Sequence, residues 1–354
     1  MNKLKTTPLF ESHKKRGAKI VPFVGWKMPL EFTNAKKEHL SVRESVGIFD
    51  VSHMGEIHIK DPKALEFLSS VLTNNIQDLK DNHCQYTLMC NEQGGVLDDM
   101  ILYCLKKPSD YLLCVNAGNT EKILKWMRAH SSISIEDVSS KWGQIAVQGP
   151  YSKTLIEKIF QPNHLKKFQF DFADFSGSAH LISRTGYTGE DGFEILSPQN
   201  KVLDLWEKLL SLKANPIGLA ARNTLRLEMK YPLYGPDMDE TVSPVEMGLS
   251  WACKNKSDFI GKEACFKKTQ RRWVGFEILE KSGIPRTSYS VFSEDKELIG
   301  NVTSGAFSPS LEKMIGLALV KKDFSEQGRR FFVQIHGNLA LSQVVPTPFY
   351  VLNK

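Results

Sequence analysis

Residues 85–105 of the chain read QYTLMCNEQGGVLDDMILYCL. Two apolar runs, Gln85–Cys90 and Val96–Leu105, flank a short segment that contains Asn91 and two glycines. Apolar runs of this length on either side of a glycine turn predict a β-hairpin.

The segments around this hairpin predict an α+β unit. Tyr111–Val115 predicts a third strand, while Leu65–Leu72 and the amphipathic segment Asn119–His130 predict helices. Three strands and a helix in this order within residues 50–140 are typical of one compact α+β unit.

A similar alternation returns downstream and then gives way to strands alone. The middle of the chain predicts three strands and two helices, at Trp142–Val147, His180–Arg184, Phe193–Leu196, Val202–Leu212 and Ile217–Lys230. The C-terminal part predicts five short strands, at Trp273–Leu279, Tyr289–Phe292, Leu298–Val302, Ile315–Val320 and Phe331–Ile335. Strands at this spacing indicate a small all-β terminal domain.

Length and composition are those of a soluble globular protein. The 354 residues suffice for two or three domains, and 41% are hydrophobic and 24% charged. No apolar run approaches the roughly 18 residues that cross a bilayer, and Met1–Lys5 leads into polar sequence, which predicts a bacterial cytoplasmic location without membrane association. The net charge of +6, with several basic doublets, would attract an acidic protein or a polyanionic small molecule. Nucleic-acid binding is not expected, because no basic stripe is interleaved with aromatic residues.

The cysteines and the missing motifs exclude several enzyme classes. The six cysteines contain no C-x-x-C pair, so zinc and iron–sulfur motifs are absent. Four lie in apolar, strand-like stretches, which predicts buried and unreactive thiols in a reducing compartment. No P-loop, G-x-G-x-x-G, H-E-x-x-H or G-x-S-x-G is present, which argues against a metallohydrolase, a nucleotide-dependent enzyme and a serine hydrolase.

Asp98 and Asp99 are adjacent carboxylates in the second strand of the hairpin. Neighbouring strand residues point to opposite faces, so the two do not form an acid–base dyad. One of them is expected to be solvated near the turn. The other becomes a site candidate if it faces inward, because buried carboxylates are rare without a partner.

Glu194 follows a segment, Arg184–Gly192, that contains three glycines. The glycines predict a tight, irregular loop between strands. Glu194 then has two equally supported interpretations. It is either a charge on the solvent face of an edge strand, or a carboxylate beside a backbone-lined hollow that accepts two hydrogen bonds from a guanidine-like heterocycle.

Residues 215–228 predict a helix that begins at Asn215-Pro216 and places Arg222 and Arg226 one turn apart on one face. The pattern alone favours a surface stripe, paired with Glu228 or another acid, over an anchor for ligand carboxylates. Five aromatic residues could wall a flat ligand but are more often core: Tyr86, Tyr231, Trp251, Phe349 and Tyr350.

Taken in order, these segments resemble the aminomethyltransferase (T-protein) family of the glycine cleavage system. The resemblance runs from Pro8-Leu9-Phe10 to the C-terminus. It covers the motifs Phe23-Val24-Gly25-Trp26, Gly47–Met54, Gly94–Asp99, Val115-Asn116-Ala117, Gly186–Glu194, Leu219–Glu228, Pro244-Val245-Glu246, Phe259–Glu263 and Gly300–Met314. One such motif is weak, whereas an ordered series over the full length is specific.

The resemblance implies an α+β fold of three domains in a cloverleaf, with ferredoxin-like α/β units and a small C-terminal β-barrel around a central folate channel. The implied domain 1 is discontinuous and binds folate, at residues 1–50 plus 140–245. Domain 2 is inserted at 51–139 with part of 246–270, and the barrel covers 271–354. The predicted α+β unit fits the insertion.

The resemblance also implies a reaction. An acidic carrier, H-protein, brings an aminomethyl group on its reduced lipoyl arm. Tetrahydrofolate, a co-substrate, takes the carbon as 5,10-methylenetetrahydrofolate, while ammonia and the dihydrolipoyl thiol leave. The family uses no metal and no pyridoxal phosphate, and the chain is expected to be a monomer.

Site residues follow from the same match. The essential aspartate of the family corresponds to Asp99, expected to polarise the attacking folate nitrogen or to stabilise an iminium-like centre. Glu194 matches a glutamate that binds the pterin edge, and Arg222 a folate-anchoring arginine. The other matches line the pocket: Asn116, Tyr187, Tyr86, Met54, Tyr231 and Trp251, with Tyr350 or Phe349 as the C-terminal aromatic.

Two departures from the family pattern and three kinds of relative bear on this match. Asn223 stands where the family has Asp, which favours a helix-orienting role over an ionic one, and the end Phe349–Leu352 differs from the commoner bacterial form.

Folate-dependent demethylases differ around the matched aspartate. A folate-binding protein of iron–sulfur assembly carries K-G-C-Y-x-G-Q where this chain has Asp258–Glu263. An RNA-modification partner would need a GTPase domain or a stronger basic patch.

Overall fold

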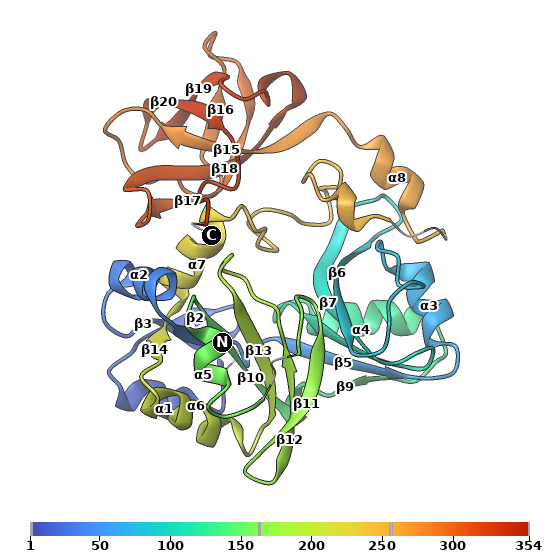
Figure 1. Cartoon of the computed structure of the whole chain (residues 1–354). Helices are drawn as coiled ribbons and strands as arrows, with labels where there is room; N and C mark the ends of the chain where they lie inside the picture. The colour runs from blue at the N-terminus through green and yellow to red at the C-terminus, as the bar shows by residue number, and fades with distance from the viewer. Residues whose placement is uncertain (1–2, 162–163, 255, 257, 353–354) are drawn as a thin grey trace. The chain divides into compact units, whose positions relative to one another are not determined.

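The computed structural model describes residues 3–161, 164–254, 256 and 258–352 (Figure 1). The chain divides into two compact units. Unit 1 consists of Met1–Leu68, Ile76–Thr87 and Met100–Asn223, and unit 2 consists of Ser69–Asn75, Leu88–Asp99 and Thr224–Lys354. The three-domain boundaries implied by the resemblance stay a prediction.

Unit 1 contains a six-stranded sheet in the order β11-β12-β13-β10-β4-β14. Its strands are β11 (Phe170–Phe175), β12 (Ser178–Ser183), β13 (Gly192–Pro198), β10 (Trp142–Gln148), β4 (Gly47–Asp50) and β14 (Asn215–Ile217). A second, three-stranded sheet consists of β1 (Lys5–Thr6), β3 (Trp26–Glu31) and β2 (Lys19–Phe23). Strand β13 is central in the larger sheet, between β12 and β10, so the residues that it carries do not lie on an edge strand.

The predicted hairpin forms two strands of a five-stranded sheet. In sheet order these are β6 (His83–Cys90), β7 (Val96–Lys106), β8 (Asp110–Val115), β5 (Gly55–Lys60) and β9 (Ile135–Asp137). The hairpin, the third strand β8 and the α+β class are therefore confirmed. Strands β6 and β7 each run from one unit into the other, because the turn between them belongs to unit 2.

Eight α-helices lie in the described ranges. They are α1 (Phe10–Lys15), α2 (Ala35–Glu44), α3 (Ala64–Val71), α4 (Thr120–Ala129), α5 (Ser152–Ile156), α6 (Val202–Ser211), α7 (Leu219–Glu228) and α8 (Lys262–Lys267), with 3-10 turns η1 (Ser139–Lys141), η2 (Ser250–Ala252) and η3 (Lys322–Phe324). The Asn34 side chain caps α2 by accepting from the Lys36 backbone N–H at 3.0 Å. Helix α6 follows its predicted pattern, since Leu205, Trp206 and Leu209 are buried on one face.

The helix expected to begin at Asn215-Pro216 begins later, at Leu219, so this boundary was wrong. The Asn215 backbone N–H donates to the Val46 carbonyl at 3.1 Å, which places the dipeptide in edge strand β14, where proline is tolerated. The Gly218 N–H donates to Oε2 of buried Glu38 at 2.8 Å, and this carboxylate at the helix N-terminus fixes the start of α7.

One hydrophobic cluster joins the six-stranded and five-stranded sheets of unit 1. Tyr103 of β7 meets Phe170 of β11 edge to face, with ring centroids 5.5 Å apart. Buried residues from both sheets complete the cluster: Cys84, Leu112, Cys114, Val138, Leu181 and Leu196. Because such cores are close-packed, β7 and β13 are held in fixed relation within unit 1.

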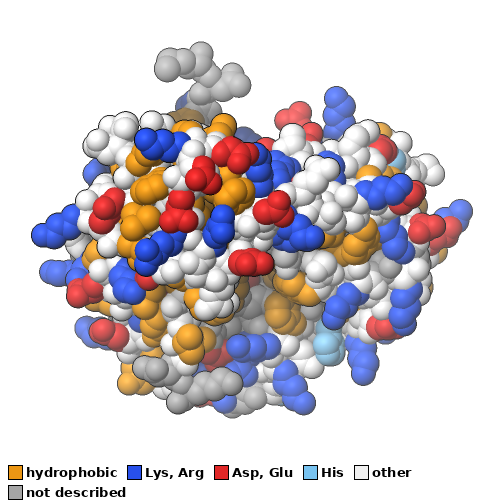
Figure 2. Space-filling view, turned by 90° about the horizontal axis from the view of Figure 1, so that it is seen from above, with side chains coloured by type: hydrophobic (Ala, Val, Ile, Leu, Met, Phe, Trp, Pro, Cys, Tyr) orange, Lys and Arg blue, Asp and Glu red, His pale blue; other side chains and the backbone are white. Residues whose placement is uncertain are grey.

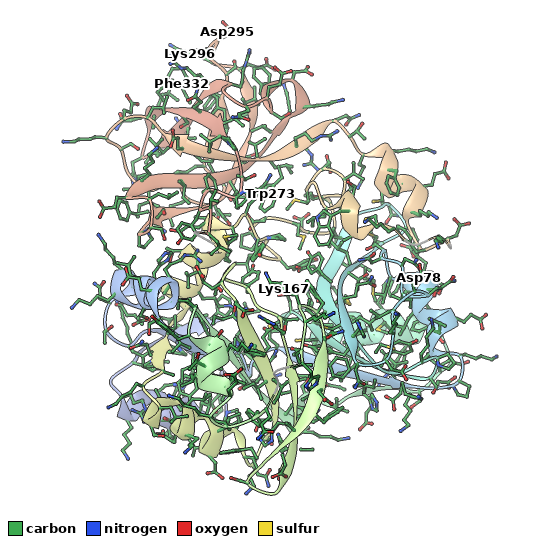
Figure 3. All side chains as sticks on the ribbon, viewed as in Figure 1. Asp78, Lys167, Trp273, Asp295, Lys296 and Phe332 are labelled. Carbon is green, nitrogen blue, oxygen red and sulfur yellow. The ribbon has the colours of Figure 1, made fainter. Side chains whose placement is uncertain are left out.

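The C-terminal part of unit 2 is a closed barrel of six strands, as predicted for a small β domain. In order around the barrel these are β15 (Arg271–Ile278), β18 (Lys313–Lys321), β17 (Leu298–Ser308), β16 (Ser290–Phe292), β19 (Arg330–Ile335) and β20 (Asn338–Val345). Alternate residues Phe331, Val333 and Ile335 of β19 fill the interior. On β15, Trp273 (Figure 3) donates through Nε1 to Thr303 at 3.0 Å.

Candidate functional site

One glutamine, Gln148, holds the glycine-rich loop Arg184–Gly192 of unit 1 in place. Gln148 donates through Nε2 to the Thr185 carbonyl at 3.1 Å, and its Oε1 accepts from the Thr188 hydroxyl at 2.9 Å. A Cβ added at Gly186 would lie 1.9 Å from Oε1 of Gln148. Glycine at this position therefore lets the glutamine pass against the loop backbone.

Two ion pairs fix the far side of the same loop. Arg43 of α2 donates to the Thr188 carbonyl at 2.7 Å and to Glu190 at 2.9 Å. Arg184 binds both carboxylate oxygens of Asp191, at 2.9 and 2.7 Å. Bidentate arginine–carboxylate geometry restricts orientation as well as distance, so the loop presents a defined backbone surface.

Glu194 of β13 ends a chain of hydroxyl groups. The Thr185 hydroxyl donates to Oε2 of Glu194 at 2.6 Å, and Ser183 Oγ lies 2.8 Å from Thr185 Oγ1. The Tyr103 hydroxyl is 3.3 Å from Ser183 Oγ and completes the chain. Within the described ranges, Oε1 of Glu194 accepts no hydrogen bond. One oxygen is thus available to a ligand, and the edge-strand interpretation of Glu194 is wrong because β13 is central.

The surroundings of Glu194 disfavour its charge. Desolvation is the largest influence and raises the pKa of Glu194 above its ordinary value, although the Thr185 hydrogen bond and the Arg222 charge lower it. A partly exposed carboxylate in this state gains from a ligand that supplies N–H donors, because the donors stabilise the charged form.

Arg222 places a cation near the Glu194 carboxylate. It lies in the first half of α7, with its guanidinium carbon 4.9 Å from the centroid of the Tyr187 ring. Its charge acts on both Glu194 and His53. Three predicted ligand residues, Glu194, Tyr187 and Arg222, are therefore close together in unit 1.

His53 lies near Arg222 as well, although the sequence analysis gave it no role of its own. It is 3% exposed, its ring meets Phe23 edge to face, and its Nδ1 has no hydrogen-bond partner among the described residues. Burial first, and then the Arg222 charge, lower the pKa of His53 to about 4, so the ring is neutral near pH 7. The available signal was its place between Asp50 and Met54 in the quoted motif.

The remaining predicted ligand residues of unit 1 are partly exposed. Met54 follows β4 and packs against the cluster that contains Tyr103. Tyr86 lies on β6, and Asn116 directly follows β8, where its carbonyl accepts from the Asn119 N–H at 2.8 Å. These positions keep all three side chains accessible to a ligand.

In unit 2, the adjacent aspartates of β7 differ in burial, as expected for neighbouring residues of a strand. Asp98 is fully buried, whereas Asp99 is partly exposed. A Cβ at Gly95 would lie 1.7 Å from the Glu240 carbonyl oxygen, so the turn packs directly on the 235–242 loop. Burial selects Asp98 as the inward-facing carboxylate, while the family match selects Asp99. Only Asp99 is partly exposed, and contact with a substrate requires exposure.

The aromatic candidates of unit 2 differ in exposure. Trp251 is 53% exposed, and Tyr231 and Tyr350 are partly exposed. The Phe349 ring packs against β15, since a Cβ added at Gly275 would lie 2.8 Å from its Cζ atom. Phe349 is therefore already engaged in packing on the barrel.

Arg226 is not part of a surface stripe, so that expectation was wrong. It is 2% exposed and donates to Asp237 at 2.6 Å and to the Ser304 hydroxyl at 2.7 Å. The Thr303 and Ser304 hydroxyls both donate to Oδ1 of Asp237, at 2.6 and 2.7 Å. A register shift in β17 between Val302 and Ser304 lets these neighbouring hydroxyls reach the same carboxylate.

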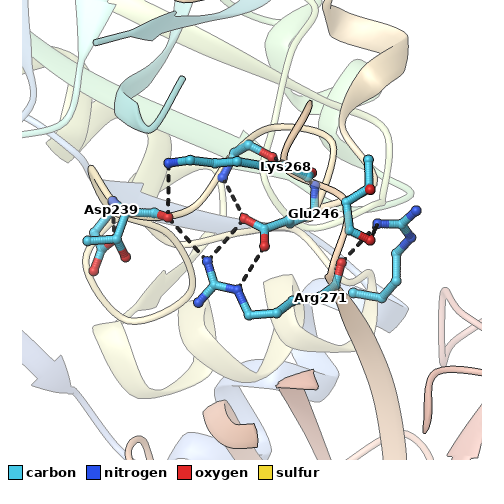
Figure 4. Close-up of polar contacts among 8 residues, drawn as sticks. Asp239, Glu246, Lys268 and Arg271 are labelled. Carbon is cyan, nitrogen blue, oxygen red and sulfur yellow. Dashed lines mark hydrogen bonds and ion pairs between the residues drawn. The ribbon is translucent and has the colours of Figure 1, made fainter. Parts of the chain in front are cut away.

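A second polar network in unit 2 joins the barrel to the preceding loop (Figure 4). Arg271 donates to both carboxylate oxygens of Glu246, at 2.7 and 3.1 Å, and to the Thr241 carbonyl at 3.2 Å. Beside it lies a cavity of about 630 Å³, lined by residues 235–239 and by β17 among others. None of the predicted folate residues lines this cavity.

Figure 2 shows basic and acidic side chains interspersed on one face of the molecule. Within the described ranges, no three His, Cys, Asp or Glu side chains are grouped so that they could hold a metal ion. No helix in those ranges is both long and apolar enough to span a membrane.

Comparisons with known proteins match almost the full length of the chain. The GCVT N-terminal domain model matches residues 9–257, and the glycine cleavage T-protein C-terminal barrel model matches residues 271–350. The aminomethyltransferase of Bdellovibrio bacteriovorus is 45% identical, over 98% of this chain and 99% of that protein. That of Geobacillus kaustophilus is 44% identical, with the same coverage. A crystal structure of glycine cleavage system aminomethyltransferase T from Bartonella henselae superposes with a TM-score of 0.92, at 34% identity and 98% coverage of each chain.

Proposed function

Since the chain belongs to the glycine cleavage T-protein family of aminomethyltransferases, we propose that it transfers a methylene carbon from aminomethyl-dihydrolipoyl H-protein to tetrahydrofolate. The products are 5,10-methylenetetrahydrofolate, ammonia and dihydrolipoyl H-protein. The enzyme class rests on the family match, and the folate and carrier-protein substrates are part of the proposal.

The observation that carries the folate assignment is the group formed by Glu194, Arg222 and Tyr187. A pterin amide edge presents neighbouring N–H donors, and Glu194 offers them an accepting oxygen in a desolvated setting. Arg222 supplies a cation for the carbonyl or carboxylate oxygens of the folate, and Tyr187 supplies an aromatic face. Together these residues suit a ligand that combines a flat, polar heterocycle with an anionic tail.

Asp99 is proposed as the residue that acts on the reacting atoms. Its partly exposed carboxylate would hold the attacking folate nitrogen, or stabilise positive charge as ammonia leaves. Asp98 is proposed to have a structural role, because it is fully buried.

The other predicted contacts are proposed as pocket walls. These are Met54, Tyr86, Asn116, Tyr231, Trp251 and Tyr350. Tyr350 is preferred to Phe349 as the C-terminal ligand aromatic, because the Phe349 ring is engaged against Gly275.

The proposal also includes the architecture and the cellular setting. Three domains in a cloverleaf around a central folate channel are proposed, with the boundaries given above. A monomer in the bacterial cytoplasm that meets H-protein is proposed as well, supported by the bacterial origin of the matched relatives. Binding of nucleic acid or of a membrane is not part of the proposal.

A single-turnover assay tests this function. Aminomethylated H-protein and tetrahydrofolate are mixed with the protein, and ammonia and 5,10-methylenetetrahydrofolate are followed. Asp99→Asn should lower turnover by about 10²-fold or more, since positioned acid–base groups supply roughly 10²–10⁴, while folate binding persists. Glu92→Gln, an exposed carboxylate on the same turn, is the matched control and should keep full activity.

Each outcome of the assay has a clear meaning. Full turnover in Asp99→Asn would contradict its role. Tight folate binding without ammonia release in the unmodified protein would contradict the reaction, and methylated thioethers and amines would then be the substrates to test.

A further inference from the structure

The turn between β2 and β3 places a valine where the backbone disfavours it. Phe23 pairs with Trp26, so two residues form the hairpin loop. These are Val24 and Gly25, and their φ values of +46° and +82° are those of a type I′ turn. Asparagine, aspartate or glycine is favoured at the first of these positions, whereas a β-branched side chain there is a steric outlier. Burial does not account for the valine, because Val24 is 52% exposed.

A second turn of unit 1 has the same geometry without the branched side chain. The β11–β12 hairpin also has a two-residue loop, Ser176-Gly177, with φ values of +54° and +73°. Its first position carries a small, exposed polar residue, which tolerates this backbone more readily than valine does. Because strained residues persist where the surroundings require them, the valine of the β2–β3 turn needs a local explanation.

The Val24 side chain packs on the turn that follows β8. A Cβ added at Gly118 would lie 2.6 Å from Cγ1 of Val24, so this methyl group lies directly against the Gly118 backbone. Gly118 belongs to a turn that the Asn119 N–H closes by donating to the Asn116 carbonyl at 2.8 Å. Asn116, a predicted ligand residue, thus begins the turn on which Val24 rests.

Thr120, the first residue of α4, fixes the same turn at another point. Its hydroxyl donates to the Ala117 carbonyl at 3.4 Å, and a Cβ added at Gly55 would lie 2.1 Å from its Oγ1 atom. Gly55 is paired with Val115 of β8, so the turn starts from a fixed strand end. These contacts restrict the two ends of the turn, and the valine supports its middle.

Phe23 connects the β2–β3 turn to a second segment of the candidate site. Its ring meets the His53 ring edge to face, with centroids 5.7 Å apart. His53 directly precedes Met54, another predicted pocket residue. Two neighbouring residues of the hairpin therefore contact the two segments that carry Met54 and Asn116.

We propose that Val24 is a positioning residue of the folate site, which holds the Asn116 turn through its contact with Gly118 and so fixes where the Asn116 side chain meets the ligand. The inference rests on the proposed function, which assigns folate to this part of unit 1. The strain at Val24 persists because the contact needs its methyl group, whereas glycine at this position would relieve the strain and lose the contact. Val24 thus lowers local stability and preorganises the pocket.

Titration calorimetry with tetrahydrofolate under anaerobic conditions, together with urea unfolding of the full chain, tests this role. Val24→Gly should raise the Kd for tetrahydrofolate by about three- to tenfold, because a less preorganised site binds more weakly. The same variant should unfold at an unchanged or higher urea concentration, because glycine adopts positive φ freely. A residue that serves folding alone would show the opposite pattern, with a lower unfolding midpoint and an unchanged Kd.

Three further variants are matched to Val24→Gly. Ser176→Gly makes the equivalent change in the other type I′ turn of unit 1 and should leave the Kd unchanged. Val24→Ile keeps the branched Cβ and the Cγ1 atom, so it should retain the Kd of the unmodified protein. In an Asn116→Ala background, Val24→Gly should have little further effect on the Kd, because Val24 acts through Asn116.

The outcomes separate this inference from the proposed function. An unmodified protein that does not bind tetrahydrofolate would contradict the proposed function as a whole. If the unmodified protein binds, an unchanged Kd or a lower unfolding midpoint in Val24→Gly would overturn the inference alone. So would an equal loss of affinity in Ser176→Gly, or an effect of Val24→Gly that is as large in the Asn116→Ala background as in the unmodified protein.

Discussion

Two arginines on the same helix, α7, have opposite surroundings. Arg226 is buried and donates to Asp237 and to Ser304, and Asp237 accepts two further hydroxyl hydrogen bonds. Arg222, one turn earlier, is partly exposed and lies over the Tyr187 ring, near the half-satisfied carboxylate of Glu194. One sequence pattern thus gives a closed polar core in unit 2 and an open polar group in unit 1.

The buried carboxylates differ in how many of their oxygens accept hydrogen bonds. This difference separates carboxylates with a structural role from one that can bind a ligand. Burial of a charge is tolerated when every lone pair and proton has a partner, as around Asp237. Glu228 follows the same rule, since Ser308 and Ser310 donate to its two oxygens at 2.5 to 3.2 Å. Glu194 does not follow this rule, because its Oε1 accepts no hydrogen bond from the described residues. A ligand can therefore donate to this oxygen. The comparison predicts that variants of the closed core change stability, whereas variants of the open group change affinity.

The largest expected effect comes from Asp237→Asn. The substitution leaves the Arg226 charge buried without its counter-ion, which should lower the free energy of unfolding by about 3–5 kcal/mol. Urea unfolding followed by circular dichroism measures the loss. Asp239→Asn, an exposed neighbour on the same loop, should change the free energy by less than about 0.5 kcal/mol. An unchanged free energy of unfolding in Asp237→Asn would mean that Asp237 is not the buried counter-ion of Arg226.

Removal of the Glu194 carboxylate should instead act on binding. Glu194→Ala should weaken tetrahydrofolate binding by about 1–3 kcal/mol, the range for a lost hydrogen bond to a charged group. Anaerobic titration calorimetry measures the affinity, and Glu157→Ala on the surface of unit 1 serves as the control. Unchanged affinity in Glu194→Ala would remove Glu194 from the site.

The raised pKa of Glu194 also gives the sign of a pH effect. The folded protein holds this proton more tightly than the unfolded chain, so the associated stability is present at low pH and is lost as pH rises through the raised pKa. Folate donors need the ionised form, so affinity should increase with pH over the same interval. Glu194→Gln should abolish that dependence and should be at least as stable as the unmodified protein near pH 7.

His53 allows a test of intermediate size, which concerns only the residues around Arg222 and Glu194 in unit 1. Its folded pKa of about 4 lies below the ordinary value of 6.5, so between these values the unfolded chain binds a proton that the folded protein excludes. Stability should therefore fall by about 2 kcal/mol between pH 7 and pH 5 through this residue. Urea unfolding of His53→Gln at both pH values should show a correspondingly smaller loss. Identical pH slopes in the two proteins would contradict the buried, neutral state of His53.

The sequence predicted local features well and their partners poorly. The hairpin at residues 85–105 was predictable because its period, length and turn residues are all local. Arg226 was misjudged because its partners Asp237 and Ser304 come from a loop and from a bulged barrel strand that helical spacing does not encode. His53 was overlooked for a related reason, since the burial that sets its pKa is a property of the packed unit. The family match identified Glu194 and Arg222, but spacing alone could not have brought them together.

The smallest expected effect is the coupling between Arg222 and Tyr187. A guanidinium over an aromatic face at 4.9 Å contributes about 0.5–1 kcal/mol at a partly exposed position. A double-mutant cycle with Arg222→Met and Tyr187→Leu, read out as the free energy of unfolding in urea, should show a coupling energy of that size. The Arg184 and Phe193 pair, with the guanidinium carbon 5.9 Å from the ring centroid, lies in the same unit and gives a control cycle. Coupling in the control cycle but not between Arg222 and Tyr187 would show that the Arg222 guanidinium does not interact with the Tyr187 ring, and folate binding at this site would then depend on Glu194 alone.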